Sequence, residues 1–495
     1  MPQFTAVFGP LSATLHGLIV SSILLPAATV ALLSGSVAEV LGRKLTIGYG
    51  ALAFAVGAAL EAGATSLTIL ICGRVIVGVG EGLFLSTLVV YICEISPPSR
   101  RGVLASLVQG LITVGLCLGY FLAYGTIRIS SSLAWRLPLA IQAIVALALA
   151  IACFTYLPES PRWLTSRGRQ ADATAVWDAL DVSSAEREKE SLEQARNQPT
   201  LPTTLTGHFR HQFSQLRLVF HKTSRQQLLL GMFLMSFQQL SGIDGIFYYS
   251  PLLFRQAGLS SSTASFLASG VSALIIMLTT IPAFLLSDKI GRRPSTLYGG
   301  IVLFACMSLI GSLYASNAVH AGDGAARWVV IVTLYIYSVM YCSTWALGIK
   351  IFVTEIQPLE TRAAAAGVAQ AANGFMNFFV AFITPVLLAH SSFGAYFLFA
   401  GAIFTTLIVC VVAMPETRGK DLEEVQLVLR QHQASSSRLW RLCLRIGRWL
   451  GNNHNCEVTT GRTTMVTLEE VDHETIELAA LDGVRSQPAS RLVAE

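Results

Sequence analysis

The stretch Gln238-Gln239-Leu240-Ser241-Gly242-Ile243-Asp244-Gly245-Ile246-Phe247-Tyr248-Tyr249-Ser250-Pro251 lies inside a hydrophobic span at about residues 227–250. This span is long enough to cross a bilayer, yet it carries two adjacent amides, a carboxylate, two glycines and two tyrosines. Hydrocarbon does not tolerate unpaired polar groups, so these must face protein or a water-filled cavity. A polar helix interrupted by glycine at mid-membrane is typical of the cargo site of a transporter. The alternative is polar bonding between packed helices, which needs fewer groups.

The composition of the 495-residue chain indicates a polytopic membrane protein. It is 53% hydrophobic and 13% charged, whereas a soluble domain is about a quarter charged. The net charge of +5 lies mainly in loops and the tail, so it bears on topology and not on nucleic acid. The nine cysteines show no metal-ligand spacing and read as packing residues. We expect no cofactor, no metal and no enzymatic activity, since no nucleophile–base constellation is present.

Eleven apolar stretches are long enough to span a bilayer. They lie at about 14–37, 46–66, 68–92, 104–125, 136–157, 227–250, 262–287, 295–316, 327–352, 364–390 and 394–414. Basic loops alternate with loops that are poor in Lys and Arg. By the positive-inside rule the basic loops and the C-terminal tail are cytoplasmic, which places Met1 outside. We therefore predict an all-α, multi-pass protein in a lipid bilayer, and we expect the plasma membrane.

Three motifs recur in the same order and at nearly the same offset. Glu39-x2-Gly42-Arg43-Lys44 returns as Asp288-x2-Gly291-Arg292-Arg293, Glu94-x2-Pro97-x3-Arg101 as Glu355-x2-Pro358-x3-Arg362, and Pro158-Glu159-Ser160 as Pro415-Glu416-Thr417. Such repetition indicates two parallel halves.

The repeat divides the chain into four predicted regions. They are a five-span bundle at 1–157, a cytoplasmic loop with short helices at 158–226, a six-span bundle at 227–414, and a cytoplasmic tail at 415–495. The span at 227–250 precedes the first motif of its half, and the first half has no counterpart to it. We expect that the first helix of a twelve-span design is missing, either because the start of the sequence was lost or because the protein lacks one cavity-lining helix.

The repeated motifs predict a charged latch at the cytoplasmic face. An acidic residue followed by Gly-Arg-Lys/Arg suits a tight turn between two helices, and an arginine can pair with a carboxylate of a neighbouring helix end. The candidate pairs are Arg101 or Arg43 with Glu159, and Arg362 or Arg293 with Glu416. The carboxylates of Glu39, Glu94, Asp288 and Glu355 can join these pairs. Such pairs would hold the inner helix ends together in one state and break in another. Signals for membrane insertion are the alternative, but insertion does not need the carboxylates.

Five motifs together resemble the signatures of sugar porters, a branch of the major facilitator superfamily, and the fungal members above all. They are Pro158-Glu159-Ser160-Pro161-Arg162-Trp163-Leu164, Gln238-Gln239-Leu240-Ser241-Gly242-Ile243, Gly291-Arg292-Arg293, Pro415-Glu416-Thr417-Arg418-Gly419-Lys420, and Gly73-Arg74-x3-Gly78-x-Gly80-x-Gly82 followed by Tyr91-x2-Glu94. The similarity covers about residues 11–425.

The resemblance implies two helix bundles around a central cavity, here of five and six spans, that rock in alternating access. It also implies short cytoplasmic helices within 160–226. It assigns sugar contacts to Gln109, Gln238, Gln239 and Asn377, and an outer gate to Tyr248 and Tyr249. Amide side chains both donate and accept hydrogen bonds, which suits the hydroxyls of a polyol.

Two cavity positions depart from the family pattern. Asp244 stands where the family usually has Asn, and Lys350 where it has a sugar-stacking Trp. An unpaired charge at mid-bilayer costs about 2.5–3.5 kcal/mol on insertion scales. Because these positions face each other in the family, we expect an ion pair or a switch linked to protons or substrate; a fixed structural pair is the alternative. A carboxylated solute such as a sugar acid, drawn by Lys350, competes with a neutral sugar as cargo.

Proton coupling has two candidate residues. Family symporters carry an acidic residue in the first helix, which is absent here. Glu81 follows Arg74 by two helical turns, and it either pairs with Arg74 or titrates; Asp244 is the other candidate. Proton symport and facilitated diffusion both remain open.

The tail contains a basic amphipathic segment. Arg438, Arg441, Arg445 and Arg448 recur on one helical face near 437–450, with Trp440 between them and Trp449 directly after the last. This pattern favours binding to an anionic inner leaflet, with a solvated arginine face as the alternative. Residues 457–495 are polar, and we expect them to be disordered.

These patterns predict a secondary transporter of a sugar or related small polar solute. We expect it to work as a monomer by alternating access, with no covalent chemistry and no nucleic-acid partner. The alternatives are a carrier of a sugar acid, a non-transporting nutrient receptor on the same scaffold, and an inactive fragment.

Overall fold

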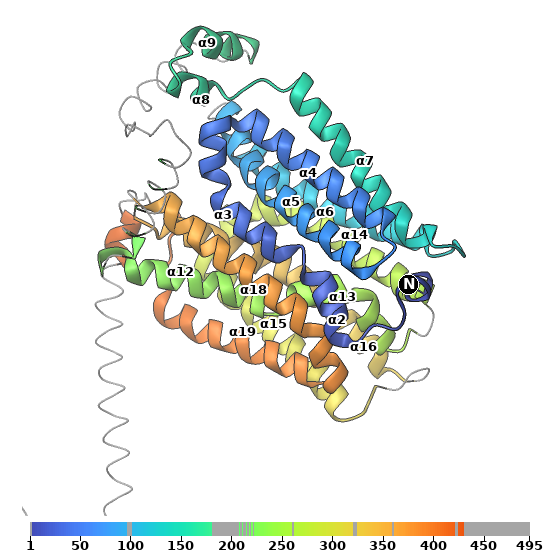
Figure 1. The fold of residues 1–495 in the computed structure, drawn as a ribbon. Coiled ribbons are helices and arrows are strands. Elements are labelled where there is room, and N and C mark those ends of the chain that lie inside the picture. The colour runs from blue at the N-terminus through green and yellow to red at the C-terminus, as the bar shows by residue number, and fades with distance from the viewer. Residues whose placement is uncertain are drawn as a thin grey trace, which may run out of the picture. The chain divides into compact units, whose positions relative to one another are not determined.

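In the computed structural model, helices are the only regular secondary structure of the part of the chain that it describes, which contains no strand (Figure 1). The described residues are 2–96, 101–180, 222–259, 262–319, 324–358, 361–420 and 424–429, with 207, 210, 214, 217, 219 and 220 between them. The predicted amphipathic helix near 437–450 and the rest of the tail lie outside these residues. The all-α prediction is confirmed.

In the described residues, the first half contains five stretches that are long and apolar enough to cross a membrane. Its helices are α1 Pro2–Phe8, α2 Ala13–Ser21, α3 Leu24–Leu41, α4 Arg43–Gly63, α5 Leu67–Ile95, α6 Arg101–Thr126 and α7 Leu133–Thr155. Helices α2 and α3 together make one apolar span, Ala13–Leu41, which is interrupted at residues 22–23.

In the described residues, the second half has a helical stretch at each of its six predicted spans, and two of these stretches are irregular. Its helices are α12 Lys222–Leu240, α13 Ile243–Gln256, α14 Ser262–Ile290, α15 Arg292–Ala315, α16 Ala326–Met340, the π-helical turn η1 Tyr341–Trp345, α17 Ala346–Glu355, α18 Arg362–His390 and α19 Gly394–Ala413. One span is broken into α12 and α13, and another runs through α16, η1 and α17. Within the described residues, nine stretches are long and apolar enough to cross a membrane. The other two predicted spans are α12–α13 and α14. Within α14, Ala264–Thr280 is a shorter apolar helix.

Two short helices follow the first half. They are α8 Pro161–Ser166 and α9 Gln170–Ala179, in the segment where short cytoplasmic helices are expected. Ser160 caps α8 by accepting from the N–H of Trp163, and the Trp163 indole donates to the Glu39 carbonyl at 2.8 Å. This bond ties α8 to the end of α3.

The two halves meet through two sets of helices. Helices α2 and α3 pack on α18, and α6 packs on α14 (Figure 1). Inside the first half, α4 and α5 approach closely because glycines face backbone across the contact. A Cβ added to Gly57 would lie 2.7 Å from the Gly73 carbonyl oxygen, so no larger residue fits there without a shift. Small residues at such contacts drive helix packing in lipid, where apolar burial alone gives little.

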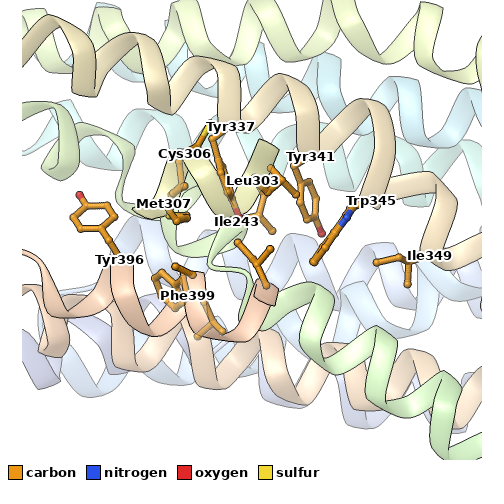
Figure 2. Packing of buried hydrophobic residues seen from close by; sticks show 14 of the residues in the cluster. Ile243, Leu303, Cys306, Met307, Tyr337, Tyr341, Trp345, Ile349, Tyr396 and Phe399 are labelled. Atoms are coloured by element: carbon orange, nitrogen blue, oxygen red, sulfur yellow. The ribbon is translucent and has the colours of Figure 1, made fainter. Parts of the chain in front are cut away.

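The second half is packed with large side chains instead. Figure 2 shows Trp345, Tyr337 and Phe399 converging around Ile243 at the start of α13. The indole N–H of Trp345 donates to the Thr296 carbonyl at 2.9 Å, which satisfies its polar atom inside the core. This core fixes the position at which the α12–α13 span is broken.

Candidate functional site

The break between α12 and α13 organises the site. Gly242 has φ +88°, in the left-handed region that favours glycine, and a Cβ there would run into the Phe399 ring. The Tyr337 hydroxyl donates to the Ser241 carbonyl at 2.8 Å, so the carbonyl at the break has a partner at membrane depth. The break places Asp244 in the first turn of α13, where a helix N-terminus favours a negative charge.

Gln238 forms part of the wall of the site and is not a free contact. Its Nε2 donates to the Trp345 carbonyl at 2.7 Å, and its Oε1 accepts from Asn373 Nδ2 at 3.2 Å. Only 1% of the residue is exposed. In this structure, Gln238 therefore positions its neighbours, whereas the family resemblance assigns it a sugar contact.

Gln239 and Asn377 each leave an acceptor unused. Gln239 Nε2 donates to Asn373 Oδ1 at 3.2 Å, and Asn377 Nδ2 donates to the Tyr248 hydroxyl at 3.3 Å. Gln239 Oε1 and Asn377 Oδ1 are buried without a hydrogen-bond partner. A buried acceptor in that state costs about 1–3 kcal/mol. Both atoms are therefore suited to donors that a bound solute brings.

Asn373 joins these amides, and sequence reasoning missed it. It donates to Gln238 Oε1 and to the Met235 carbonyl, and it accepts from Gln239. The signal was its position on α18, one turn before Asn377, since residues four apart lie on the same helix face.

Asp244 and Lys350 face each other without touching. Lys350, on α17, is exposed, yet protein groups surround it and it interacts electrostatically with Asp244. A side chain that is accessible to solvent and also surrounded by protein groups is typical of the wall of an internal cavity. Gln239 lies beside the Asp244 carboxyl, and within the described part of the chain Lys350 has no contact ion pair. The predicted juxtaposition is therefore present, while a contact ion pair is not.

A cavity of about 820 Å³ lies between the halves beside the two predicted gate tyrosines. It is lined by Tyr248 and Tyr249 of α13, His16 of α2, Tyr120 of α6 and Phe266 of α14. Tyr249 is buried and donates to the Ala381 carbonyl at 2.7 Å, whereas Tyr248 is 39% exposed. Tyr248 therefore has more freedom to move than Tyr249.

The two remaining cavity candidates lie in the first half. Glu81 of α5 is half-buried and interacts electrostatically with Tyr248. The expected pair between Glu81 and Arg74 is wrong, because Arg74 Nε lies 3.9 Å from Glu61 of α4 instead. Two turns of helix separate Arg74 from Glu81, whereas Glu61 lies against α5 at Gly73. Gln109 of α6 is half-buried and has no hydrogen bond to the described residues.

The first charged cluster lies at helix ends that the alternation of basic loops predicts to be cytoplasmic, so we call it a cytoplasmic cluster; it is centred on Arg43. Its guanidinium donates to both carboxylate oxygens of Glu94 at 3.0 Å and to Glu39 at 2.6 Å. The Glu159 carboxylate accepts instead from the backbone N–H groups of Arg43, at 2.8 Å, and Lys44, at 3.1 Å. Glu159 thus caps the start of α4.

The second cluster repeats this plan with looser contacts. Arg292 lies 3.3 Å from Glu355, and the Thr417 hydroxyl donates to Glu355 at 2.6 Å. The Glu416 carboxylate accepts from the backbone N–H groups of Arg292 and Arg293, both at 3.1 Å. Glu416 therefore caps α15 as Glu159 caps α4.

The expected side-chain pairs of Arg43 with Glu159 and of Arg293 or Arg362 with Glu416 are therefore wrong, whereas the expected pair of Arg101 with Glu159 stays a prediction. The positive φ of Gly42, +96°, and of Gly291, +85°, turns the next backbone N–H groups toward these carboxylates. The Arg293 guanidinium donates to the Val411 carbonyl and that of Arg362 to the Gln357 carbonyl. The side chains of Arg101 and Asp288 lie outside the described residues. Each described cluster joins helices of one half.

Comparison with known proteins gives consistent matches. Residues 5–429 match the family model described as "Sugar (and other) transporter". The chain is 30% identical over 416 residues to the sugar transport protein MST3 of Oryza sativa subsp. japonica, covering 83% of this chain and 78% of that protein. It is 30% identical to the glucose transporter GlcP of Staphylococcus epidermidis, covering 85% and 90%.

Solved structures agree with this. The partially occluded inward-open xylose transporter XylE from E. coli superposes with a TM-score of 0.67 at 25% identity, covering 85% of this chain and 93% of that one. A structure described as the proton:xylose symporter XylE of the major facilitator superfamily, bound to 6-bromo-6-deoxy-D-glucose, gives a TM-score of 0.67 at 26% identity, covering 86% and 93%.

Proposed function

The chain belongs to the sugar transporter family of the major facilitator superfamily and is a multi-pass membrane protein that transports sugar, and on that premise we propose where it holds its solute. The solute lies against the wall formed by α12, α13, α17 and α18. The observation that carries this proposal is the pair of buried, unpartnered acceptors Gln239 Oε1 and Asn377 Oδ1. Sugar hydroxyls donate to both, while Gln238 and Asn373 hold the wall in place.

The geometry supports alternating access by rigid halves. Because each cytoplasmic cluster joins helices of its own half, it keeps that half rigid while the halves rock across the α6–α14 contact and the contact of α2 and α3 with α18. Tyr248, hydrogen-bonded to Asn377, moves with the solute and closes the outer side.

Proton coupling is the second part of the proposal. Asp244 in the second half and Glu81 in the first half are carboxylates at the depth of the solute, and both interact with Tyr248. A relative of known structure is described as a proton:xylose symporter. We further propose a plasma-membrane monomer with a cytoplasmic C-terminus, as the alternation of basic loops predicts.

Uptake by a host that lacks its own sugar transporters tests the function. Radiolabelled glucose and xylose are offered with and without a protonophore, and surface protein is quantified. We expect accumulation that the protonophore abolishes, and a loss of roughly tenfold or more for Gln239→Leu and Asn377→Leu, since each removes an acceptor for a hydroxyl. Surface protein that accumulates neither sugar would contradict transport and favour the nutrient receptor.

A further inference from the structure

We propose that Lys350 admits a second class of cargo, sugars that carry a carboxylate, and that Asp244 releases Lys350 to this cargo by taking up a proton. The inference rests on the proposed function, because it uses the same wall of α12, α13, α17 and α18. It specifies both the chemical class of the solute and the place where the proton is held.

The first step is the state of the Lys350 ammonium. The side chain is exposed on α17 although protein groups surround it, and it makes no contact ion pair with the described residues. A charge enclosed in this way is costly at membrane depth unless an anion lies close. Asp244 interacts with it electrostatically but makes no contact ion pair, so a solute carboxylate can supply the direct, charge-assisted hydrogen bonds that the ammonium lacks.

The second step is the position of the hydroxyl acceptors on the same wall. Gln239 is 8% exposed and its Oε1 has no partner, and Asn377 Oδ1 is likewise unpartnered. Helix α12 packs on both α17 and α18, so these acceptors and Lys350 belong to adjoining helices. A solute with hydroxyl donors and a carboxylate satisfies both kinds of group at once. Aldonates and uronates have that chemistry.

The third step is the balance of charge. Without solute, the Asp244 carboxylate faces the Lys350 ammonium. A bound sugar acid brings a second carboxylate to the same cation, and two carboxylates sharing a site disfavour double ionisation. Asp244 therefore binds a proton from the outer water. The loaded site then holds one carboxylate, one ammonium and one neutral acid, so each anion crosses with one proton and no net charge.

The other groups around Asp244 fit this exchange. Its neighbours are Gln239 of α12, Tyr248 of α13, Tyr337 of α16, Tyr341 and Cys342 of η1, and Lys350 of α17. Apart from Lys350, none of these neighbours is a cationic side chain. Glu81 faces Tyr248 from the first half. The cation that Asp244 gives up to the solute is therefore Lys350.

Uptake measurements on the full chain separate this inference from the proposed function. Radiolabelled D-glucose and D-glucuronate are offered to the same transporter-null cells, at several external pH values and with the membrane potential set by valinomycin and potassium. The variants are Lys350→Met and Asp244→Asn. Lys44→Met is the matched control, because its side chain lies at the cytoplasmic start of α4, away from the cavity.

We expect the wild type to take up both solutes, with glucuronate uptake rising in acid and independent of membrane potential. Lys350→Met should lower glucuronate uptake by a factor roughly tenfold to a hundredfold greater than its effect on glucose uptake, since only glucuronate loses a charged hydrogen-bond partner. Asp244→Asn should make the glucuronate uptake that remains sensitive to membrane potential, because the anion then crosses without its proton. Lys44→Met should match the wild type for both solutes.

Three outcomes would overturn the inference. Wild type that carries glucose but not glucuronate removes the second cargo and leaves the proposed function intact. Equal loss of both solutes in Lys350→Met makes the lysine structural. Glucuronate uptake that moves charge in the wild type removes the proton from the scheme. Surface-localised wild type that carries neither solute overturns the proposed function itself.

Discussion

The cytoplasmic clusters and the central site use the same kinds of side chain in opposite ways. In the clusters, the carboxylates of Glu94, Glu159 and Glu416 accept bonds from guanidinium or backbone donors. In the central site, Gln239 Oε1 and Asn377 Oδ1 have no partner, and Lys350 stands apart from Asp244. Completed bonding makes a rigid joint, whereas incomplete bonding keeps groups available to a solute. The difference predicts that substitutions in the clusters reduce stability and that substitutions in the site reduce transport.

The largest effect on stability is expected for Arg43→Met. The substitution leaves Glu94 buried without its cation, and breaking a buried pair in this way costs about 3–5 kcal/mol. Arg292→Met is the matched change in the second cluster, where the guanidinium–carboxylate distance is 3.3 Å and both side chains are more exposed. We expect a smaller loss there. Denaturant unfolding of the two purified variants checks the order, and equal losses would contradict it.

The next effect is expected for Gly42→Ala. Its φ of +96° and ψ of 162° lie in a region that is essentially restricted to glycine, and holding an alanine in that region costs about 1–3 kcal/mol. The new Cβ also meets the Glu159 carboxylate. Gly35→Ala is the control, because Gly35 lies within α3 with open space at the Cβ position. Thermal unfolding should show a loss for the first variant alone; comparable curves would refute the cap geometry.

A smaller effect is expected for Glu159→Gln. The amide oxygen still accepts from the N–H groups of Arg43 and Lys44, so the variant loses the charge at the start of α4 and keeps the bonds. A charge at a helix end contributes about 0.3–1 kcal/mol. Glu159→Ala, which removes the acceptor as well, should be clearly less stable. The same melting temperature for both variants would show that the cap contributes nothing.

The smallest effect on stability is expected for Gln239→Leu, which nevertheless should abolish most transport. The variant loses one bond to Asn373 and removes an unpartnered acceptor, so stability should change by less than about 1 kcal/mol. Gln238→Leu is the adjacent comparison, since it leaves the Trp345 carbonyl and Asn373 without partners and should unfold more easily. A Gln239→Leu protein that is markedly unstable would place this residue with the scaffold.

The sequence predicted features that depend on local pattern. The apolar spans, the interruption at Gly242 and the turns at Gly42 and Gly291 all follow from composition and repetition. It predicted that Asp244 and Lys350 lie near each other, but it did not predict which partner Arg74 has on the neighbouring helix. Arg74 contacts Glu61 and not Glu81 because α4 lies against α5, and no spacing within α5 reveals that neighbour. Asn373 was missed because the family resemblance points to Asn377, one turn away on the same face.

The capping carboxylates have a consequence for how the chain is made. Glu159 follows the α4 start that it caps by 116 residues, and Glu416 follows its α15 start by 124. In each half, the first cytoplasmic turn thus waits for a group that leaves the ribosome only after the last span of that half. The first half completes its own turn before the second half is translated, so it can settle as a unit early in biogenesis.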